Sequence, residues 1–414
     1  MQKAPQDVSA SRRVSNLDWR ILLCLFSPPM LFIAFLAIFA LSSTSVFQNP
    51  FTFSLSSPLL SPPDDRSPHT KIAVCLVGGA RRFELTGPSI LHNILLVYPH
   101  ADLFLHSPLD SNSFKFSLLK SSPRIASVRI FRPRDIPPSP SQERVLSPFN
   151  SPNGIQGLLQ YFNLVEGCLT MIQAHQAQRN FTYDWVIRTR VDGYWSGPLG
   201  PETFLNRTYL VPSGSSYGGL NDRFGIGDFN TSTVALSRLS MISEIDAAGH
   251  RNLNSESSFK AQLTVRGVPF ATTRLPFCVI SDRSYEFPPK QYGVPVAAIG
   301  SPGPLSGMKC RPCEAACEGD CVAGIMDSLN REWSWSESIN GSVKLCNANA
   351  EWEGEWESEF DRVAGEKLAG ERLRVRNMKV EECVRDFVEM RRRAARWESP
   401  PVEDICKLGI VGKR

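Results

Sequence analysis

The sequence lacks a surplus of charge of either sign. Its 414 residues carry 45 Lys and Arg against 41 Asp and Glu, a formal net charge of +4. This near balance of positive and negative charges argues against nucleic-acid binding through bulk charge. No internal repeat is visible, and 42% apolar with 21% charged residues excludes a wholly disordered or collagen-like chain. The composition therefore predicts one large globular domain or two modest ones.

Two phosphate-binding fingerprints are also missing. The segment 78–82, GGARR, has neither the GxGxxG pattern of dinucleotide-binding folds nor the Lys-Ser/Thr ending of a phosphate loop. A nicotinamide enzyme or an ATPase is therefore disfavoured. The paired glycines still let backbone amides approach an anion, which makes Arg81 a candidate phosphate ligand. The alternative for Arg81 is a solvated turn residue.

Cysteine is neither scarce nor dense, with 11 residues in the chain. That is many for a cytosolic protein and few for a small disulfide-rich scaffold. Four of them follow the spacing C-x2-C-x3-C-x3-C, which is too compressed for two separated pairs of zinc ligands. We therefore expect disulfides, with Cys346, Cys383 or Cys406 as candidate partners, and keep zinc as the alternative. Cys24 and Cys75 lie in apolar segments and are expected to be inert thiols. The four clustered cysteines are Cys310, Cys313, Cys317 and Cys321.

Residues 21–41 form a 21-residue stretch without a charge. As a helix this stretch would span roughly 31 Å, about the hydrocarbon thickness of a bilayer. Basic residues outnumber acidic ones before it, which predicts a cytosolic N-terminus and a lumenal body, a type II arrangement. Pro28 and Pro29 interrupt the run, so a cleaved signal peptide is an alternative; a buried core helix conflicts with these prolines.

Asn-x-Ser/Thr sequons support the same compartment. Such triplets accept glycans in the secretory pathway, although they also arise by chance. Together with the anchor and the cysteines, they lead us to expect a single-pass glycoprotein of the Golgi membrane with its body in the lumen. The sequons begin at Asn180, Asn206, Asn230 and Asn340.

The pattern of apolar residues predicts an α/β fold built on an open, mostly parallel sheet. The run KIAVCLVGG at 71–79 is typical of a parallel strand buried on both faces. Strands and helices then alternate, as in doubly wound folds. We predict further strands at 101–106 and 183–190, helices at 88–98, 157–176 and 255–264, and a long surface loop at 121–152 around a possible short strand at 127–131.

The chain divides into five regions. A Ser/Pro-rich stem follows the anchor, and beyond Gly300 the sequence becomes rich in Cys and Trp and then in amphipathic helical patterns. We expect the tryptophans there to pack a helical C-terminal appendage rather than to stack on sugars. The regions are a cytosolic tail 1–20, the anchor 21–41, the stem 42–69, the α/β domain 70–300 and the C-terminal region 301–414; the tryptophans are Trp333, Trp335, Trp352 and Trp356.

The strongest candidate site lies at residues 188–192, RTRVD, at the end of a predicted strand. Open α/β sheets bind ligands outside the carboxyl ends of their strands, which would place Arg188, Arg190 and Asp192 at the ligand. A diphosphate needs cations or a bridging metal, and a carboxylate there can hold that metal or a sugar hydroxyl. The alternative is an Arg–Asp ion pair that closes a loop.

Two further segments carry candidate residues. Asn221, Asp222 and Arg223 follow a Gly/Ser-rich stretch and precede two glycines, as in a loop that contacts substrate. A plain turn into a strand is the alternative. Glu256 lies one turn before Lys260 on a predicted helix, which makes it a candidate base or a member of a surface ion pair.

Taken in order, KIAVCLVGGARRF, ADLFLH, YDWVIRTRVDGYW, NDRFGIGD and NSESSFKAQL resemble the successive landmarks of membrane-anchored glycosyltransferase-like proteins. The likeness is closest to an uncharacterised plant family with this layout. It covers residues 71–285 for the transferase-like core, and the CRPC segment with the Trp-rich stretch for the plant family.

This resemblance implies a GT-A-like (Rossmann-like) fold that uses a nucleotide sugar as donor. It places Arg81 near the nucleotide, Asp192 in the position of the metal-binding acidic motif, and Asn221 and Asp222 near donor or acceptor. Mn²⁺ or Mg²⁺ would then be the cofactor. The chain has Arg190-Val191-Asp192 where the common motif is Asp-x-Asp, so metal dependence stays open.

We therefore expect a Golgi type II membrane glycosyltransferase-like protein that transfers a sugar from a nucleotide-sugar donor to a glycan or glycoprotein. Positioning and neutralisation of the leaving diphosphate would provide the catalysis. Asp192 and Glu256 are the candidate catalytic residues. The alternative is a non-catalytic lumenal scaffold or lectin-like protein on the same fold.

Overall fold

The computed structural model describes residues 70–149, 151, 153–287, 294–329, 342–349, 351–352 and 354–411. These residues all belong to one compact unit, Leu60–Arg414. The expected anchor 21–41 and stem 42–69 lie outside the described residues, as do Trp333, Trp335 and Asn340. Within the described ranges, no helix is both long and apolar enough to cross a membrane.

The centre of the unit is an eight-stranded sheet with the order β12-β3-β2-β1-β4-β7-β6-β8. Neighbours from β12 to β4 are all parallel, whereas β7 runs antiparallel to β4 and β6. The prediction of a mostly parallel α/β sheet is thus confirmed. The strands are β1 (Ile72–Val77), β2 (Asp102–Pro108), β3 (Ile125–Phe131), β4 (Trp185–Arg190), β6 (Tyr209–Pro212), β7 (Phe224–Asp228), β8 (Phe270–Thr273) and β12 (Arg396–Glu398).

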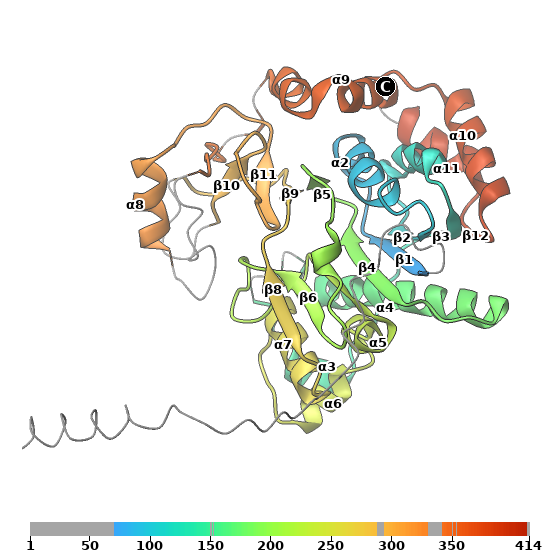
Figure 1. The fold of residues 1–414 in the computed structure, drawn as a ribbon, viewed down its shortest axis with the longest axis vertical. Helices are drawn as coiled ribbons and strands as arrows, with labels where there is room; N and C mark the ends of the chain where they lie inside the picture. Colours follow the sequence, from blue (N-terminus) through green and yellow to red (C-terminus); the bar gives the residue numbers. More distant parts are fainter. Residues whose placement is uncertain are drawn as a thin grey trace, which may run out of the picture. The chain divides into compact units, whose positions relative to one another are not determined.

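Helices cover both faces of this sheet (Figure 1). Because side chains alternate along a strand, β1 sends Val74 and Leu76 into one apolar cluster and Ala73 and Cys75 into another. The first cluster includes residues of α2 (Phe83–Ile90), the π-helix η1 (Leu91–Leu95), the 3-10 helix η2 (Ser113–Ser121), α10 (Val380–Arg393) and α11 (Val402–Ile410). The second includes residues of α4 (Gly154–Arg179), α5 (Phe229–Leu236) and α7 (Ser255–Val265). Burial on both faces explains why β1 is apolar at every position.

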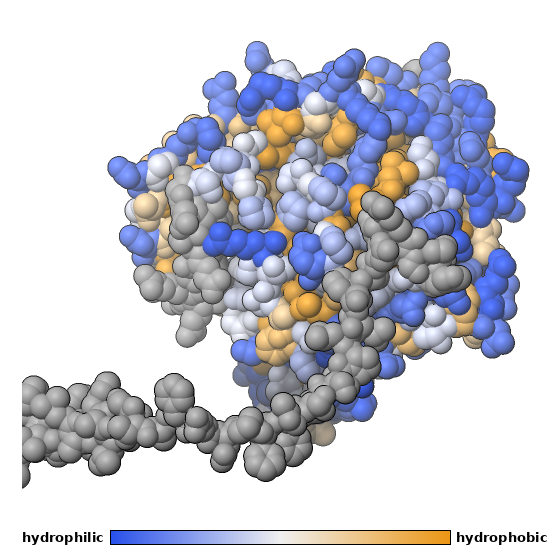
Figure 2. Space-filling model, viewed as in Figure 1, coloured by the Kyte–Doolittle hydropathy of each residue, from blue (hydrophilic) through white to orange (hydrophobic). Residues whose placement is uncertain are grey.

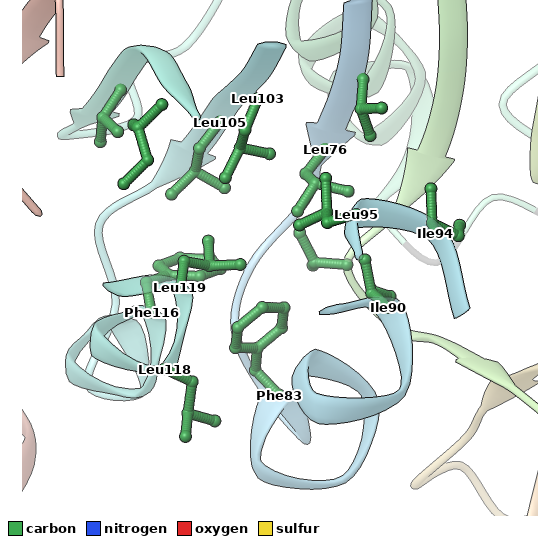
Figure 3. Packing of buried hydrophobic residues seen from close by; sticks show 14 of the residues in the cluster. Leu76, Phe83, Ile90, Ile94, Leu95, Leu103, Leu105, Phe116, Leu118 and Leu119 are labelled. Carbon is green, nitrogen blue, oxygen red and sulfur yellow. The ribbon is translucent and has the colours of Figure 1, made fainter. Parts of the chain in front are cut away.

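The first cluster is densely packed around Phe83 (Figure 3). Phe83 of α2 meets Phe116 of η2 edge to face, with ring centroids 4.9 Å apart and an interplanar angle of 61°. Leu76 of β1 and Leu105 of β2 belong to the same cluster. The ring contact joins α2 to η2 directly after the 78–82 turn, and the shared cluster packs both helices against the sheet.

The expectation of a long surface loop at 121–152 is wrong, although the possible short strand at 127–131 is found as part of β3. Residues 125–131 form β3, an interior strand between β2 and β12, whose Ile125, Val128 and Ile130 are buried. Residues Pro140–Val145 form α3, which begins with a capping box between Ser139 and Gln142. The described prolines that suggested a loop lie outside these elements or, as Pro140 does, at the first position of α3, where a proline interrupts no ladder or helix hydrogen bond.

A second sheet of four strands has the order β10-β11-β9-β5. Its strands are β5 (Gly193–Trp195), β9 (Phe277–Ile280), β10 (Val296–Ala298) and β11 (Met308–Arg311). β5 follows β4 almost directly, so the end of the main sheet adjoins the start of the second. The remaining elements are η3 (Pro201–Thr203), α6 (Ile242–Ala247), α8 (Asp320–Ser328) and α9 (Trp356–Arg376).

Five disulfides link these elements, and they confirm the disulfide prediction for the cysteine cluster. The cluster does not pair only within itself, because Cys310 and Cys313 bond to residues outside it. Cys75 was expected to be a free thiol; this is wrong, since Cys75 on β1 faces Cys168 on α4. The pairs are Cys75–Cys168, Cys278–Cys310, Cys313–Cys346, Cys317–Cys321 and Cys383–Cys406.

The C-terminal helices were expected, and their place in the fold was not. Phe387 of α10 and Ile405 of α11 are buried in the same cluster as β1. The short strand β12 then pairs in parallel with β3 and completes one edge of the main sheet. The outward-facing surface over α9, α10 and α11 is largely hydrophilic (Figure 2), as expected for helices with one buried side.

Candidate functional site

A polar cavity of about 270 Å³ opens where β1 and β4 end. It is bordered by the turn after β1, the turn after β4, the N-terminal part of α4, the segment after β9, and β11. Both sheets therefore contribute to it. Its lining residues are Val77, Gly78, Gly79, Arg81, Arg82, Ser151, Asn153, Gly157, Tyr161, Arg190, Val191, Asp192, Ile280, Ser281, Asp282, Arg283 and Lys309. This cavity is called the basic pocket below.

The local sequence shapes the turn after β1. Gly78 has a φ of +126°, a conformation that residues with a side chain rarely adopt. A Cβ atom there would also lie 3.0 Å from Cγ2 of Val191 in the neighbouring turn. Glycine at this position lets the two turns approach each other, which brings Arg81 and Arg190 to one cavity.

Positive charge dominates the basic pocket. Five cationic side chains line it against two carboxylates, those of Asp192 and Asp282. Each carboxylate is paired with one arginine, as described next. Among the described residues, the side chains of the other three cations form no hydrogen bond or ion pair; these are Arg81, Arg283 and Lys309.

Arg190 and Asp192 form a bidentate ion pair across the turn after β4. Nε of Arg190 donates to Oδ1 of Asp192 at 2.8 Å, and Nη2 donates to Oδ2 at 2.6 Å. Burial alone would raise the pKa of the Asp192 carboxyl, but the charge and hydrogen bonds of Arg190, with Lys309 and Arg223 nearby, lower this pKa to about 2. Asp192 is therefore ionised at any physiological pH and both of its oxygens are engaged.

Lys309 reaches the basic pocket from β11. Burial lowers the pKa of its ammonium well below the usual value, and the charges of Arg223, Arg190 and Arg283 lower it further, while Asp192 opposes them. Such an environment disfavours the charged form as long as no additional anion is present. The sequence analysis did not single out Lys309.

Arg82 is held at the mouth of the basic pocket by two tryptophans. Its guanidinium lies over the ring of Trp352, 4.1 Å from the centroid, and 5.1 Å from that of Trp356. Its Nε donates to Oδ1 of Asp282 at 2.7 Å. The indole of Trp352 in turn donates to the carbonyl of Ser281 at 3.1 Å. These two tryptophans thus pack within the protein, as expected, and they position a pocket arginine.

Arg188 does not line the basic pocket. It is buried beneath it on β4, where Nη1 donates to the backbone carbonyl of Asp222 and to the hydroxyl of Tyr161 at 3.2 Å. The Tyr161 hydroxyl itself donates to the same carbonyl at 2.7 Å. Since Tyr161 does line the pocket, Arg188 supports the wall from behind.

The segment 221–223 is likewise buried outside the pocket. The Asn221 amide donates to the carbonyls of Gly214, at 2.9 Å, and Ser306, at 3.3 Å. Arg223 donates through Nη1 to the hydroxyl of Ser215 at 2.8 Å and to the carbonyl of Gly307. These bonds tie the loop before β7 to the loop before β11. Lys309 lies on β11 itself. Asp222 accepts from the hydroxyl of Ser255 at the start of α7.

Glu256 is half-buried in the first turn of α7, and it does not line the basic pocket. The helix that carries it was predicted at 255–264 and is found at Ser255–Val265. Burial, and then the nearby charge of Asp222, raise the pKa of the Glu256 carboxyl to about 8. At neutral pH Glu256 is therefore mainly protonated, which does not suit the role of a general base.

Of the predicted residues, Arg81, Arg190 and Asp192 meet in the basic pocket, whereas Arg188, Asn221, Asp222, Arg223 and Glu256 do not line it. Sequence reasoning missed Tyr161, Asp282, Arg283 and Lys309. The available signal for Lys309 was weak: a lysine between Met308 and Cys310 in a short apolar strand. For Arg283 there was only a polar run directly after an apolar strand.

The donor set at Asp192 does not fit a divalent cation. Mg²⁺ and Mn²⁺ need free carboxylate or other oxygen ligands. Both oxygens of Asp192 already accept from Arg190, and the neighbouring charge of Arg223 would repel a cation. Among the residues that the structure describes, no three His, Cys, Asp or Glu side chains form a metal-binding group.

The clustered cysteines give the zinc alternative no support either. All four are consumed in disulfides, which leaves them no thiolate to bind a metal.

Fold and pocket together define an α/β protein with a cationic cavity at the carboxyl ends of its parallel strands. The chain belongs to the family described as "Domain of unknown function (DUF7796)", whose model matches residues 67–412. That match spans both the 70–300 and the 301–414 region of the sequence analysis. No curated protein matches the chain. The family description names no activity, so function has to be argued from the site.

Proposed function

We propose that this protein transfers a sugar from a nucleotide-sugar donor to a glycan or glycoprotein acceptor. The observation that supports this most is the surplus of cations in the basic pocket. The pocket lies at the carboxyl ends of β1 and β4, where open α/β sheets bind their ligands. A nucleoside diphosphate is an anion of matching charge, and arginines bind phosphate oxygens through paired N–H groups.

In this proposal the cations act mainly on the leaving group. An acceptor hydroxyl attacks the anomeric carbon, the bond from that carbon to the phosphate oxygen breaks, and the nucleoside diphosphate departs with an added negative charge. Arg81, Arg283 and Lys309, which have no ion-pair partner among the described residues, stabilise this developing charge. Arg190 is oriented for the same role by its ion pair with Asp192.

The acceptor proton needs a base at the pocket. Asp282 is exposed there, and among the residues that the structure describes only its Oδ1 accepts a hydrogen bond, from Arg82. Oδ2 of Asp282 is thus the pocket carboxylate oxygen available to accept the proton. Glu256 is given no role as base, because it lies outside the pocket lining and is mainly protonated at neutral pH.

The proposed setting is the Golgi lumen, with a single-pass type II anchor at 21–41. Five disulfides support it, because disulfides form and persist in an oxidising compartment. The sequon asparagines Asn180, Asn206 and Asn230 are exposed, as glycan acceptors must be. The anchor itself would be tested by protease treatment of intact Golgi vesicles, which should remove the 1–20 tail and leave the lumenal body protected.

The experiment is donor binding and donor hydrolysis by the purified full-length chain in detergent, with a panel of UDP-, GDP- and CMP-sugars. We expect at least one donor to bind, and Arg81→Ala to weaken its affinity by roughly tenfold or more. Arg144→Ala is the matched control, because Arg144 is an exposed arginine paired with Asp246 and does not line the pocket. If no nucleotide sugar binds, the transferase proposal fails.

The same preparation tests the second candidate, a non-catalytic scaffold or lectin-like protein. Trp352 and Trp356, the described tryptophans that could have stacked on a sugar, contact Arg82 instead. This favours the transferase over a lectin that binds sugars through these rings. Glycan-array binding without any nucleotide binding would reverse that preference.

A further inference from the structure

The positive charges in the basic pocket are only partly neutralised by the carboxylates of the described residues. Arg190 and Arg82 each have a carboxylate partner, while Arg81, Arg283 and Lys309 have none among the described residues. Like charges that share a small cavity repel one another, and the repulsion is relieved when a multivalent anion enters. Burial lowers the pKa of Lys309, and the charges of Arg223, Arg190 and Arg283 lower it further, so repulsion from the arginines adds to the effect of burial.

The carboxylate that was expected to bind a metal, that of Asp192, is already engaged by an arginine. In the bidentate pair, the guanidinium of Arg190 occupies both oxygens of Asp192 at 2.6 and 2.8 Å. A metal could bind Asp192 only by displacing Arg190 into a cavity already rich in cations. The other pocket carboxylate, Asp282, accepts from Arg82.

We propose that the basic pocket binds a diphosphate directly, through Arg81, Arg190, Arg283 and Lys309, with no bridging divalent cation. The inference rests on the proposed function and specifies how the donor is held. Lys309 and Arg283 supply positive charge from the second sheet, and Arg81 and Arg190 supply it from the main sheet. The ammonium and the guanidinium groups together take the place of the metal's charge.

The first test is calorimetric titration of the full-length chain with UDP, GDP and inorganic pyrophosphate, in EDTA and separately in Mn²⁺. We expect the dissociation constant of each binding probe to agree within about threefold between the two buffers. Binding that appears only with Mn²⁺ would overturn the inference while leaving the transferase proposal intact. Absence of binding in both buffers would overturn both. Nucleotide binding without pyrophosphate binding would show that the base, rather than the diphosphate, provides the affinity, and would also overturn the inference.

Two variants sharpen the result. Lys309→Met should weaken UDP binding in EDTA by roughly tenfold or more, because it removes a charged phosphate ligand. Lys309→Arg keeps the charge and should retain most of the affinity. Lys344→Met is the control, since Lys344 pairs with Glu318 at the surface and lies outside the pocket lining. Unchanged UDP affinity in a folded Lys309→Met protein would contradict the assignment.

Asp192→Asn separates a metal site from a cation site. The substitution removes a charged metal ligand and keeps an amide oxygen that can accept from Arg190. It also removes one negative charge near the bound anion. We expect Asp192→Asn to change UDP affinity by the same factor, within about threefold, in EDTA and in Mn²⁺, because any effect on the position of Arg190 is equal in both buffers. A loss at least tenfold larger in Mn²⁺ than in EDTA would identify Asp192 as a metal ligand and overturn the inference. Thermal unfolding of each variant shows whether a loss of binding reflects a loss of fold.

Discussion

At the scale of single residues, Lys309 is the group whose protonation reports most directly on a bound anion. Its pKa is lowered by burial and by Arg223, Arg190 and Arg283, against the opposing charge of Asp192. An anion in the pocket favours the ammonium form and therefore raises the pKa. At a pH between the Lys309 pKa of the free site and that of the occupied site, binding of the anion therefore takes up a proton.

We therefore predict net proton uptake of up to about one proton when UDP binds, at a pH above the pKa of Lys309 in the free site. Calorimetric titration with UDP in buffers of different ionisation enthalpy measures this proton uptake. Lys309→Met should lack this component, while the contribution of the UDP phosphates remains in both proteins. Equal proton uptake in the two proteins would show that Lys309 does not titrate with binding.

Glu256 allows a prediction for stability. Its pKa is raised to about 8 in the folded protein, so the folded state holds a proton that the unfolded state releases near its ordinary pKa. The raised pKa leaves the free energy of unfolding unaffected below about pH 4. It lowers the free energy of unfolding progressively as pH rises between the two pKa values, and this loss levels off above about pH 8.

Glu256→Gln should therefore raise the unfolding temperature at pH 8, by about 1–2 °C for each 1 kcal/mol recovered in a unit of this size, and leave it nearly unchanged at pH 4. Differential scanning calorimetry at both pH values measures the change. Glu244→Gln, which removes an exposed carboxylate paired with Arg266, is the control and should show a smaller difference. A stabilisation that is equal at both pH values would contradict the assignment to the Glu256 carboxyl.

At the scale of secondary structure elements, the disulfides differ in what they connect. Cys75–Cys168 ties β1 to α4 across a sequence separation of 93, whereas Cys317–Cys321 closes a separation of 4. In the chain-entropy description, the longer loop restricts the unfolded chain more. Both cysteines of the first bond also belong to the second apolar cluster, which includes Val77 of the pocket lining.

We predict that Cys75→Ala/Cys168→Ala lowers the free energy of unfolding by about 2–5 kcal/mol. Cys317→Ala/Cys321→Ala is the matched control, and its loss should be clearly smaller. Denaturant unfolding followed by circular dichroism measures both. Equal losses would show that native-state packing around the bonds, rather than loop closure, determines their contribution.

At the scale of the whole molecule, the C-terminal segment completes the fold. Residues 394–411 supply β12 at one edge of the main sheet and α11 in the core cluster of β1. Val402, Ile405 and Cys406 are buried there. Without them, β3 becomes an exposed edge and the apolar surface of α10 loses its cover.

A chain that ends at Arg393 should therefore lose cooperative thermal unfolding and bind hydrophobic dyes. The full-length Cys383→Ala/Cys406→Ala variant is the control, because it removes the disulfide and keeps strand and helix. A truncated chain with a sharp transition near the parental unfolding temperature would show that the segment is dispensable.

Much of the fold was predictable because it follows local rules. β1, β4, α4 and α7 were predicted within a few residues, since burial on one or both faces leaves an apolar run or a helical period in the sequence. β12 could not be predicted, because three residues, Arg396-Trp397-Glu398, carry no strand period and become a strand only by pairing with β3.

The site shows the same division. The sequence alone determined that Arg81, Arg190 and Asp192 follow apolar strands, and that parallel strands end at a common edge. Tertiary structure decided that Lys309 and Arg283 join them from a second sheet, that Asn221 to Arg223 are buried supports, and that Cys75 bonds to Cys168. The reason is physical: periodicity records which side of an element is buried, whereas partners more than 90 residues apart are chosen by how sheets and helices pack.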